Sequence, residues 1–269
     1  MRELDHRGLA EALLPAVLEA GRVEMAYFDA KVAVERKADK SPVTAADREA
    51  EAILVAALAR AAPGVPIIAE EAMAAGAMPK VERTAFLVDP LDGTKEFIAG
   101  SPEFTVNIGL IADGQPVFGL IFVPATGDLY LTDGPSSAVQ ARVSGASTGL
   151  KLCDLDLRPL RSRTPDRSRL VALASRRATS AALDDLFKSL NVGEVRRLGS
   201  SLKFCLIAAG EADLYARLGE TSEWDTAAGQ AILVAAGGSV VGLDGRPLAY
   251  LKGDRRYLNP PFLAWSRAP

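Results

Sequence analysis

A succession of short apolar runs between residues 85 and 131 constrains the fold of this chain more than any other feature. The runs cover residues 85–88, 104–111, 116–123 and 128–131. Short apolar runs bounded by turn signals predict buried strands. The last three runs are separated by Asp113-Gly114 and by Ala125-Thr126-Gly127, which favour tight connections. We therefore predict a meander of antiparallel strands in the first half of the chain.

Helical patterns come before this meander, and strands alternate with helices after it. One helix is expected from about His6 to Tyr27, and a second from its N-cap Thr44 to about Ala62, with a short strand over 65–69 next. Later strands are expected over 170–174, 194–196, 212–216 and 239–241, and helices over 178–190, 200–209 and 224–236. Such alternation is typical of an α/β arrangement.

Residues 135–169 separate these two patterns. They are rich in Ser, Gly, Arg and Pro, which is typical of a passage between domains. We therefore predict an α+β domain over residues 1–150 and an α/β domain over residues 151–269.

Composition excludes several kinds of chemistry. With 31 Lys and Arg against 34 Asp and Glu, the chain lacks the basic excess of proteins that bind nucleic-acid polymers. The single histidine, His6, argues against a histidine relay or a histidine-based zinc site. Cys153 and Cys205 are too few for a disulfide framework, and we expect both to be buried thiols. Acid–base or metal chemistry must therefore use carboxylates.

Residues 1–20 lack the basic start, the continuous apolar core and the cleavage site of a signal peptide. No apolar run in the sequence is long enough to form a transmembrane helix. We therefore expect a cytoplasmic protein, and leave peripheral association with a membrane open.

Acidic residues stand at the ends of several predicted core elements. They are Asp47, Glu70, Asp89, Asp92 and Asp225. Mg²⁺ prefers oxygen ligands, usually one or two carboxylates together with water and substrate phosphate. A two-metal phosphatase needs several such carboxylates that converge. The sequence therefore supplies candidate ligands for a carboxylate-only magnesium site.

The segment Asp89-Pro90-Leu91-Asp92-Gly93-Thr94 carries most of this signal. A strand ends at Asp89, Pro90 fixes the backbone, and Asp92 adds a second carboxylate three residues after Asp89. Gly93 allows a close backbone approach. A short helix beginning near Thr94 would turn free N–H groups toward an anion. The main-chain carbonyl of Leu91 is a further candidate ligand.

Each of these acids also has a simpler explanation. The segment after Asp89 can be an ordinary turn that needs only its proline and glycine. Glu70-Glu71 can be a solvated acidic pair, and Asp47 a first-turn carboxylate that opposes the helix dipole. Asp225 can be an acid at the N-cap or first position of the helix that follows. The joint occurrence of these residues favours the metal site.

Taken in order, these residues resemble the signature of the inositol monophosphatase superfamily, which are lithium-sensitive, magnesium-dependent phosphatases. The matching residues are Asp47, Glu70-Glu71, Asp89 to Thr94, and Trp224-Asp225 with Gly237-Gly238. The resemblance implies a layered αβαβα sugar-phosphatase-like fold, with an α+β N-terminal half and an α/β C-terminal half that completes the active site. It also implies two or three Mg²⁺ ions per site, and a homodimer is a further expectation.

The resemblance implies the metal ligands as well. One Mg²⁺ would be bound by Glu70, Asp89 and the carbonyl of Leu91. A second would be bound by Asp89, Asp92 and Asp225, so that Asp89 bridges the two ions. A third, weaker ion would lie near Glu70, largely through water.

The implied catalytic residues are Asp47, Thr94 and Glu70. Asp47 and Thr94 would orient and deprotonate the attacking water, and the backbone at Gly93 and Thr94 would hold the scissile phosphate. Water attacks such a phosphate in line through a loose transition state, and no protein nucleophile is required.

Further matches point to one branch, the 3′(2′),5′-bisphosphate nucleotidases of the CysQ type, which remove the 3′-phosphate of adenosine 3′,5′-bisphosphate. The matching segments are Lys40-Ser41-Pro42-Val43-Thr44-Ala45-Ala46-Asp47, Gly199-Ser200-Ser201-Leu202-Lys203-Phe204-Cys205, Trp224-Asp225-Thr226-Ala227-Ala228-Gly229 and Leu258-Asn259-Pro260.

Several residues bear on the choice of substrate. Inositol phosphatases carry an acidic residue before the Trp-Asp motif that receives sugar hydroxyls, whereas Arg217 stands there in this chain. Arginine suits a second phosphate or a stacked base. Ser200 and Lys203 are candidates to face an anionic substrate, or else are a helix N-cap and a surface cation. Ser175-Arg176, at a strand end, is a weaker candidate of the same kind.

The predicted activity is therefore the Mg²⁺-dependent hydrolysis of adenosine 3′,5′-bisphosphate to AMP. Whether the 5′-phosphosulfate analogue is also accepted stays open. Within the same class, the alternative substrates are inositol 1-phosphate and fructose 1,6-bisphosphate. An alternative from another class is a module that senses a phosphorylated metabolite and uses its metals only for binding. The presence of both the ligands and the Asp47–Thr94 pair argues against that module.

Overall fold

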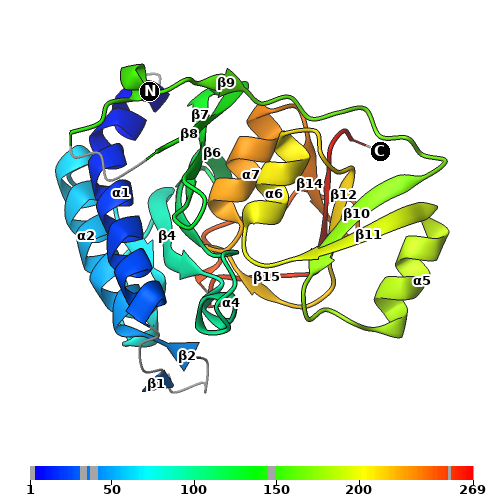
Figure 1. The fold of residues 1–269 in the computed structure, drawn as a ribbon, viewed down its shortest axis with the longest axis horizontal. Coiled ribbons are helices and arrows are strands. Elements are labelled where there is room, and N and C mark those ends of the chain that lie inside the picture. Colours follow the sequence, from blue (N-terminus) through cyan, green and yellow to red (C-terminus); the bar gives the residue numbers. More distant parts are fainter. Residues whose placement is uncertain (1–3, 31–34, 37–41, 145–148, 254–255, 269) are drawn as a thin grey trace.

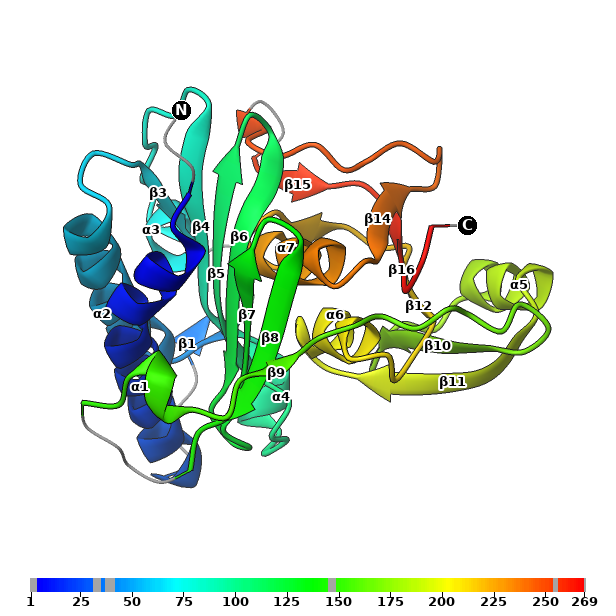
Figure 2. The same cartoon turned by 90° about the horizontal axis from the view of Figure 1, so that it is seen from above.

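The computed structural model describes residues 4–30, 35–36, 42–144, 149–253 and 256–268. Helices and sheets form layers in the order helix, sheet, helix, sheet, helix (Figures 1 and 2). The layered αβαβα fold is therefore confirmed. Lys40 and Ser41 of the first motif lie outside the described residues, whereas β1 (Glu35–Arg36) and β2 (Pro42–Val43) form a small antiparallel pair.

The outer helical layer consists of α1 (His6–Ala30) and α2 (Ala45–Ala61), which pack against each other and against the larger sheet. Thr44 is the N-cap of α2, as predicted, and Asp47 accepts a hydrogen bond from its N–H at 2.8 Å. Such a reciprocal capping box satisfies backbone groups that a helix end leaves unpaired. The buried stripe of α1 includes Ala10, Leu13, Leu14, Val17 and Ala20.

The larger sheet has seven strands in the order β3-β4-β5-β6-β7-β8-β9. They are β3 (Ile67–Ala69), β4 (Thr84–Asp92), β5 (Thr105–Ala112), β6 (Gln115–Val123), β7 (Asp128–Gly134), β8 (Ser137–Arg142) and β9 (Arg158–Pro159). β3 pairs with β4 in parallel, and every later pair is antiparallel, which confirms the predicted meander. β8 and β9 come from the stretch predicted as a passage between domains. The division at residue 150 stays a prediction.

The middle layer consists of α6 (Leu202–Ala208) and α7 (Ala227–Ala235), which lie between the two sheets (Figure 2). The smaller sheet has the order β11-β10-β12-β16-β14, and α5 (Ala181–Ser189) packs on its outer side (Figure 1). Its strands are β10 (Leu170–Ser175), β11 (Val192–Leu198), β12 (Leu214–Arg217), β14 (Ser239–Gly242) and β16 (Phe262–Trp265). The predicted alternation of strands and helices is confirmed, and β16 is a further strand that was not predicted.

Several short elements complete the chain. They are α3 (Glu70–Ala74), α4 (Thr94–Ile98), the 3₁₀ turn η1 (Leu152–Asp154), β13 (Thr221–Ser222) and β15 (Leu258–Asn259). α4 is the short helix predicted to begin near Thr94. Cys205 is buried as predicted, whereas the prediction for Cys153 is wrong, because it lies in η1 on the exposed connection between the sheets. None of the described helices is long and apolar enough to cross a membrane.

Two glycines allow α7 to lie directly on the backbone of the larger sheet. A Cβ at Gly119 in β6 would lie 2.3 Å from the carbonyl oxygen of Ala228. A Cβ at Gly109 in β5 would lie 2.6 Å from the Cβ of Ala227. No side chain fits at such distances, so the start of α7 is held close to β5 and β6. This contact fixes Asp225, two residues before α7, against the end of the sheet.

Candidate active site

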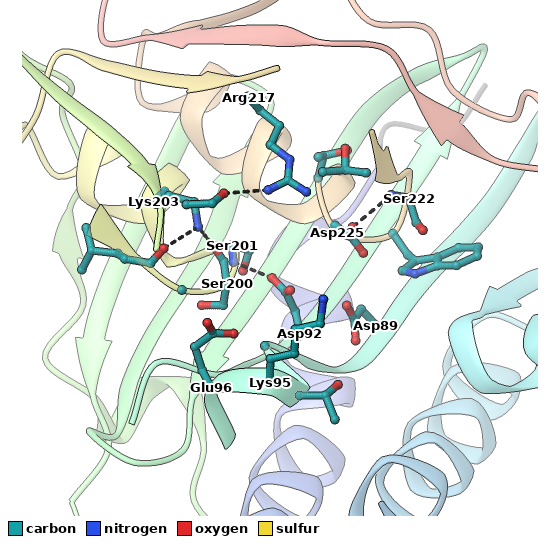
Figure 3. A pocket seen from close by; sticks show the side chains of 18 of the residues that line it. Asp89, Asp92, Lys95, Glu96, Ser200, Ser201, Lys203, Arg217, Ser222 and Asp225 are labelled. Atoms are coloured by element: carbon teal, nitrogen blue, oxygen red, sulfur yellow. Dashed lines mark hydrogen bonds between the residues drawn. The ribbon is translucent and has the colours of Figure 1, made fainter. Parts of the chain in front are cut away.

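A pocket of about 540 Å³ lies where β4, α4, α6 and the segment before α7 meet (Figure 3). Its walls come from both halves of the chain, with residues 70–96 on one side and residues 175–258 on the other. All of the candidate site residues line it except Asp47, which lies behind Thr94. The residues concerned are Glu70, Asp89, Leu91, Asp92, Gly93, Thr94, Ser200, Lys203, Arg217 and Asp225.

Three carboxylates converge on one side of this pocket. Glu70, Asp89 and Asp225 each offer an oxygen, and these oxygens all lie within 4.8 Å of one another. β3 and β4 are parallel, with Ala69 beside Val88, so the residues that follow each of them, Glu70 and Asp89, come side by side. Such an oxygen-only donor set suits a hard divalent cation. The simpler explanation of Glu70 as a solvated acid therefore fits the structure less well.

Asp225 is oriented by the turn before α7 and does not cap that helix. Its Oδ2 accepts a hydrogen bond from the N–H of Ser222 at 3.0 Å (Figure 3), and Thr226 occupies the N-cap position. Burial raises the pKa of Asp225 well above its usual range, and Asp92 and Glu70 raise it further. Without a cation, the charged form of this carboxylate is therefore disfavoured.

Asp92 points toward α6 rather than into the group of three carboxylates. The ladder between β4 and β5 shifts register between Asp89 and Asp92, and the carboxylate of Asp92 accepts a hydrogen bond from the N–H of Ser201 (Figure 3). Burial raises the pKa of Asp92 to about 6, against the opposing effects of Lys203 and the Ser201 N–H. In their charged forms the carboxylates of this site repel one another, namely Glu70, Asp89, Asp92 and Asp225. A bound cation would relieve that repulsion. The donor set therefore fits a divalent metal.

Asp47 uses its two carboxylate oxygens for different partners. Oδ2 accepts hydrogen bonds from the N–H and the hydroxyl of Thr44, at 2.8 and 2.7 Å. Oδ1 lies 3.3 Å from the hydroxyl of Thr94, which donates to it. Asp47 is therefore both a first-turn carboxylate of α2, as in its simpler explanation, and the predicted partner of Thr94. Thr94 also lies 3.3 Å from the carbonyl oxygen of Leu91, a candidate ligand.

Gly93 is required by the backbone at the turn between β4 and α4. Its φ is 102°, in the left-handed region, and a Cβ there would lie 2.8 Å from the carbonyl oxygen of Glu103. Any L side chain would therefore be both strained and obstructed. The turn places the first residue of α4, Thr94, at the pocket wall.

Basic side chains line the opposite side of the pocket. Lys203 is only 2 % exposed, so its interpretation as a surface cation is wrong. Its Nζ donates to the carbonyls of Leu198, at 3.3 Å, and Ser200 (Figure 3). Burial lowers the pKa of Lys203 to about 8, although Asp92 favours the charged form. An anionic ligand would favour that form in the same way.

The loop before α6 presents two serines in different roles. Ser201 occupies the N-cap position of α6, but the hydroxyl of Ser200 accepts the N–H of Leu202 at 3.3 Å, so the capping interpretation of Ser200 holds in part. The Ser201 hydroxyl bonds Asn107 and Thr105 at 2.7 and 2.9 Å, which ties the loop to the larger sheet. Ser200 adopts a φ of 48° and lines the pocket.

Arg217 is fixed at the pocket wall by several hydrogen bonds. It donates to the hydroxyl of Ser175 at 2.8 Å, and to the carbonyls of Gly219 and Glu220 at 3.2 and 3.0 Å. A guanidinium has five N–H donors. The remaining N–H groups of this oriented guanidinium can donate hydrogen bonds to an anion in the pocket.

Sequence reasoning missed several pocket residues. Lys95 and Arg177 line the pocket, and Arg177 pairs with Glu96 at 2.7 Å. Lys95 directly follows Thr94, so its place at the pocket could have been predicted from the motif. Arg177 reaches the pocket only through the tertiary fold. Asn259 of the late motif donates to the Thr226 hydroxyl at 2.7 Å. That contact supports the turn that carries Asp225.

Comparisons with known proteins agree with this geometry. Residues 5–265 match the model of the inositol monophosphatase family. The 3′(2′),5′-bisphosphate nucleotidase CysQ of Salmonella typhimurium is 38% identical over 256 residues, which cover 94% of this chain and 98% of the relative. The structure of CysQ from Bacteroides thetaiotaomicron has 35% identity and a TM-score of 0.77, and covers 97% of this chain and 98% of the other.

An inositol monophosphatase from Anabaena shows the same fold at greater distance. Its structure has 27% identity and a TM-score of 0.68, and covers 96% of this chain and 90% of the other. The family match spans nearly the whole chain and includes both walls of the pocket. This chain therefore belongs to the inositol monophosphatase family, and within it resembles the CysQ-type 3′(2′),5′-bisphosphate nucleotidases.

Proposed function

We propose that this chain is a Mg²⁺-dependent phosphomonoesterase that hydrolyses the 3′-phosphate of adenosine 3′,5′-bisphosphate to give AMP. One observation carries the proposal: converging carboxylates and fixed basic side chains face each other across one pocket. Carboxylates alone suit a cation, and basic groups alone suit an anion. Both together suit a phosphate ester that is bound through a metal and through protein donors.

Glu70, Asp89 and Asp225 would hold Mg²⁺, with Asp92 and the carbonyl of Leu91 as further ligands. Asp89 is central, because it belongs to the cluster with Glu70 and Asp225 and lies in the same strand as Leu91 and Asp92. When bound, Mg²⁺ would neutralise charge on the phosphoryl oxygens and lower the pKa of the attacking water.

Thr94 and Asp47 would position that water and take its proton. The Thr94 hydroxyl donates to Asp47 Oδ1, so its oxygen can accept a hydrogen bond from a water on the pocket side. As the water attacks, a proton can pass to Thr94 Oγ1 while the Thr94 proton passes to Asp47 Oδ1. Backbone N–H groups at Gly93 and Thr94, where α4 begins, would contact the phosphoryl oxygens.

The rest of the substrate would lie toward Arg217 and Lys203. A second phosphate suits an oriented guanidinium and a buried ammonium better than the hydroxyls of inositol do. The Ser200 hydroxyl would contribute a further hydrogen bond. The names of the similar CysQ proteins support this choice of a bisphosphorylated nucleotide.

A substrate panel tests the proposal. Phosphate release is measured from adenosine 3′,5′-bisphosphate, its 5′-phosphosulfate analogue, inositol 1-phosphate and fructose 1,6-bisphosphate at one Mg²⁺ concentration, and again with a chelator. We expect the highest kcat/KM for adenosine 3′,5′-bisphosphate, AMP as its product, and no turnover after chelation.

Two results would point to a different function. Faster release from inositol 1-phosphate or fructose 1,6-bisphosphate would show that Arg217 and Lys203 do not select the nucleotide. Tight binding of adenosine 3′,5′-bisphosphate without turnover, in metal-loaded protein, would favour a sensing module instead of an enzyme.

A further inference from the structure

The buried face of α2 carries two carboxylates that lie one helical turn apart. Asp47 and Glu51 are 2 % and 8 % exposed. Side chains four positions apart in a helix share a face. Asp47 reaches Thr94 on one side of the pocket. Glu51 reaches α3, the short helix whose first residue is Glu70.

α3 begins with a residue that cannot cap it. Its N-cap is Ala69, which has no side-chain oxygen to accept the first N–H groups of the helix. Glu51 supplies both acceptors from another helix. Its Oε2 accepts the N–H of Glu71 at 2.6 Å, and its Oε1 accepts the N–H of Ala72 at 2.8 Å. A carboxylate is also favoured at this end by the helix dipole.

This contact bears directly on the candidate metal centre. Glu70 lies between the pairing of β3 with β4 at Ala69 and the capped turn at Glu71. The backbone on each side of Glu70 is therefore held in place. This fixes the position from which the Glu70 side chain extends toward Asp89 and Asp225. The first turn of this five-residue helix therefore takes the acceptors for two of its N–H groups from Glu51 rather than from a local cap.

We propose that Glu51 is a positioning residue that holds Glu70 for metal binding and thereby sets the affinity of this site for Mg²⁺. The inference rests on the proposed metal-dependent function. Groups that orient metal ligands typically change metal affinity by about 10-fold to 100-fold when they are replaced. We expect Glu51 to change Mg²⁺ affinity by a similar factor, through the backbone of α3.

Three variants separate its possible contributions. Glu51→Gln keeps the length of the side chain but loses the charge and one acceptor, and Glu51→Asp keeps the charge but loses the reach. Glu49→Gln is the matched control, because Glu49 is an exposed acid on the same helix. Mg²⁺ binding is measured by calorimetry, exchange of the Glu71 and Ala72 amides by NMR in metal-free protein, and phosphate release as a function of Mg²⁺.

We expect Glu51→Gln and Glu51→Asp to bind Mg²⁺ about tenfold more weakly, with faster exchange of both amides. The half-maximal Mg²⁺ concentration for turnover should rise equally, and saturating Mg²⁺ should restore most of kcat. Glu49→Gln should behave like the unchanged protein. Thermal unfolding verifies that each variant is folded, and Glu51→Asp carries the test if Glu51→Gln is not.

Other outcomes overturn the proposal. Faster amide exchange with unchanged Mg²⁺ binding would make Glu51 only a cap. Weak binding in Glu51→Gln with normal binding in Glu51→Asp would make its charge, not its position, the cause. If no substrate is turned over but the calorimetric difference appears, the proposed function fails while the role of Glu51 stands.

Discussion

Glu24 lies on the buried face of α1 with no access to solvent. Neither of its carboxylate oxygens has a hydrogen-bond partner among the described residues. Burial raises the pKa of Glu24 well above its ordinary value, and the charge of Asp47 raises it further. The folded protein therefore keeps a proton on Glu24 at pH values where the unfolded chain has released it.

The sign of the stability change follows from this difference in bound protons. Where the folded state binds one proton more than the unfolded state, the free energy of unfolding falls by about 1.4 kcal/mol per pH unit as the pH rises. The fall begins near the unfolded pKa and ends at the folded pKa. Below this window, the unpaired buried acid still costs about 1–3 kcal/mol.

The substitution Glu24→Met removes both effects, because methionine has a similar size and no group that needs a partner. At pH 5 we expect the variant to be more stable by about 1–3 kcal/mol. The gain should increase between pH 5 and pH 8. The assay is urea unfolding at several pH values, with chelator present so that metal binding does not contribute. Glu19→Met, at a half-exposed position of the same helix where Glu19 pairs with the exposed Arg22, should change stability by less than about 1 kcal/mol.

Equal stability of Glu24→Met and the unchanged protein at pH 8 would refute this reasoning. A gain that does not depend on pH would refute the part that concerns the bound proton.

Two further substitutions test the packing around the site. Gly119→Ala should destabilise the protein by about 1–3 kcal/mol and weaken Mg²⁺ binding, because the added methyl displaces α7. Urea unfolding and calorimetry measure the two effects, and Gly134→Ala, whose Cβ would make only an ordinary contact of 3.7 Å with Ser137, should show neither. Arg163→Met removes a bidentate partner of the buried Asp213, at 2.7 and 2.8 Å, and should cost about 2–3 kcal/mol in urea unfolding. Arg158→Met breaks only an exposed pair and should cost less than about 1 kcal/mol.

Much of the fold could be predicted from local sequence patterns. Apolar runs identified β4 to β7, because each is buried on both sides between helical layers. β8 escaped prediction because its polar and apolar residues alternate at the sheet margin. α3 escaped because its first turn is stabilised by Glu51, which lies in another helix.

The candidate site could be predicted in part, because some of its residues are identified by their type and their place in the sequence. Carboxylates at strand ends and helix starts, such as Asp89 and Asp225, are recognisable from residue type and order. The burial of Lys203 and the contact between Asp92 and Ser201 depend on how α6 packs against the larger sheet. No local pattern contains that information.

The central claim is that Asp89 belongs to a metal site on which catalysis depends. Its most direct test is calorimetric titration of Mg²⁺ into chelator-treated protein, comparing the unchanged chain, Asp89→Asn and the exposed-site control Asp185→Asn. We predict that Asp89→Asn binds Mg²⁺ at least about tenfold more weakly and that Asp185→Asn binds it normally. Equal Mg²⁺ binding by Asp89→Asn and the unchanged protein would contradict this account.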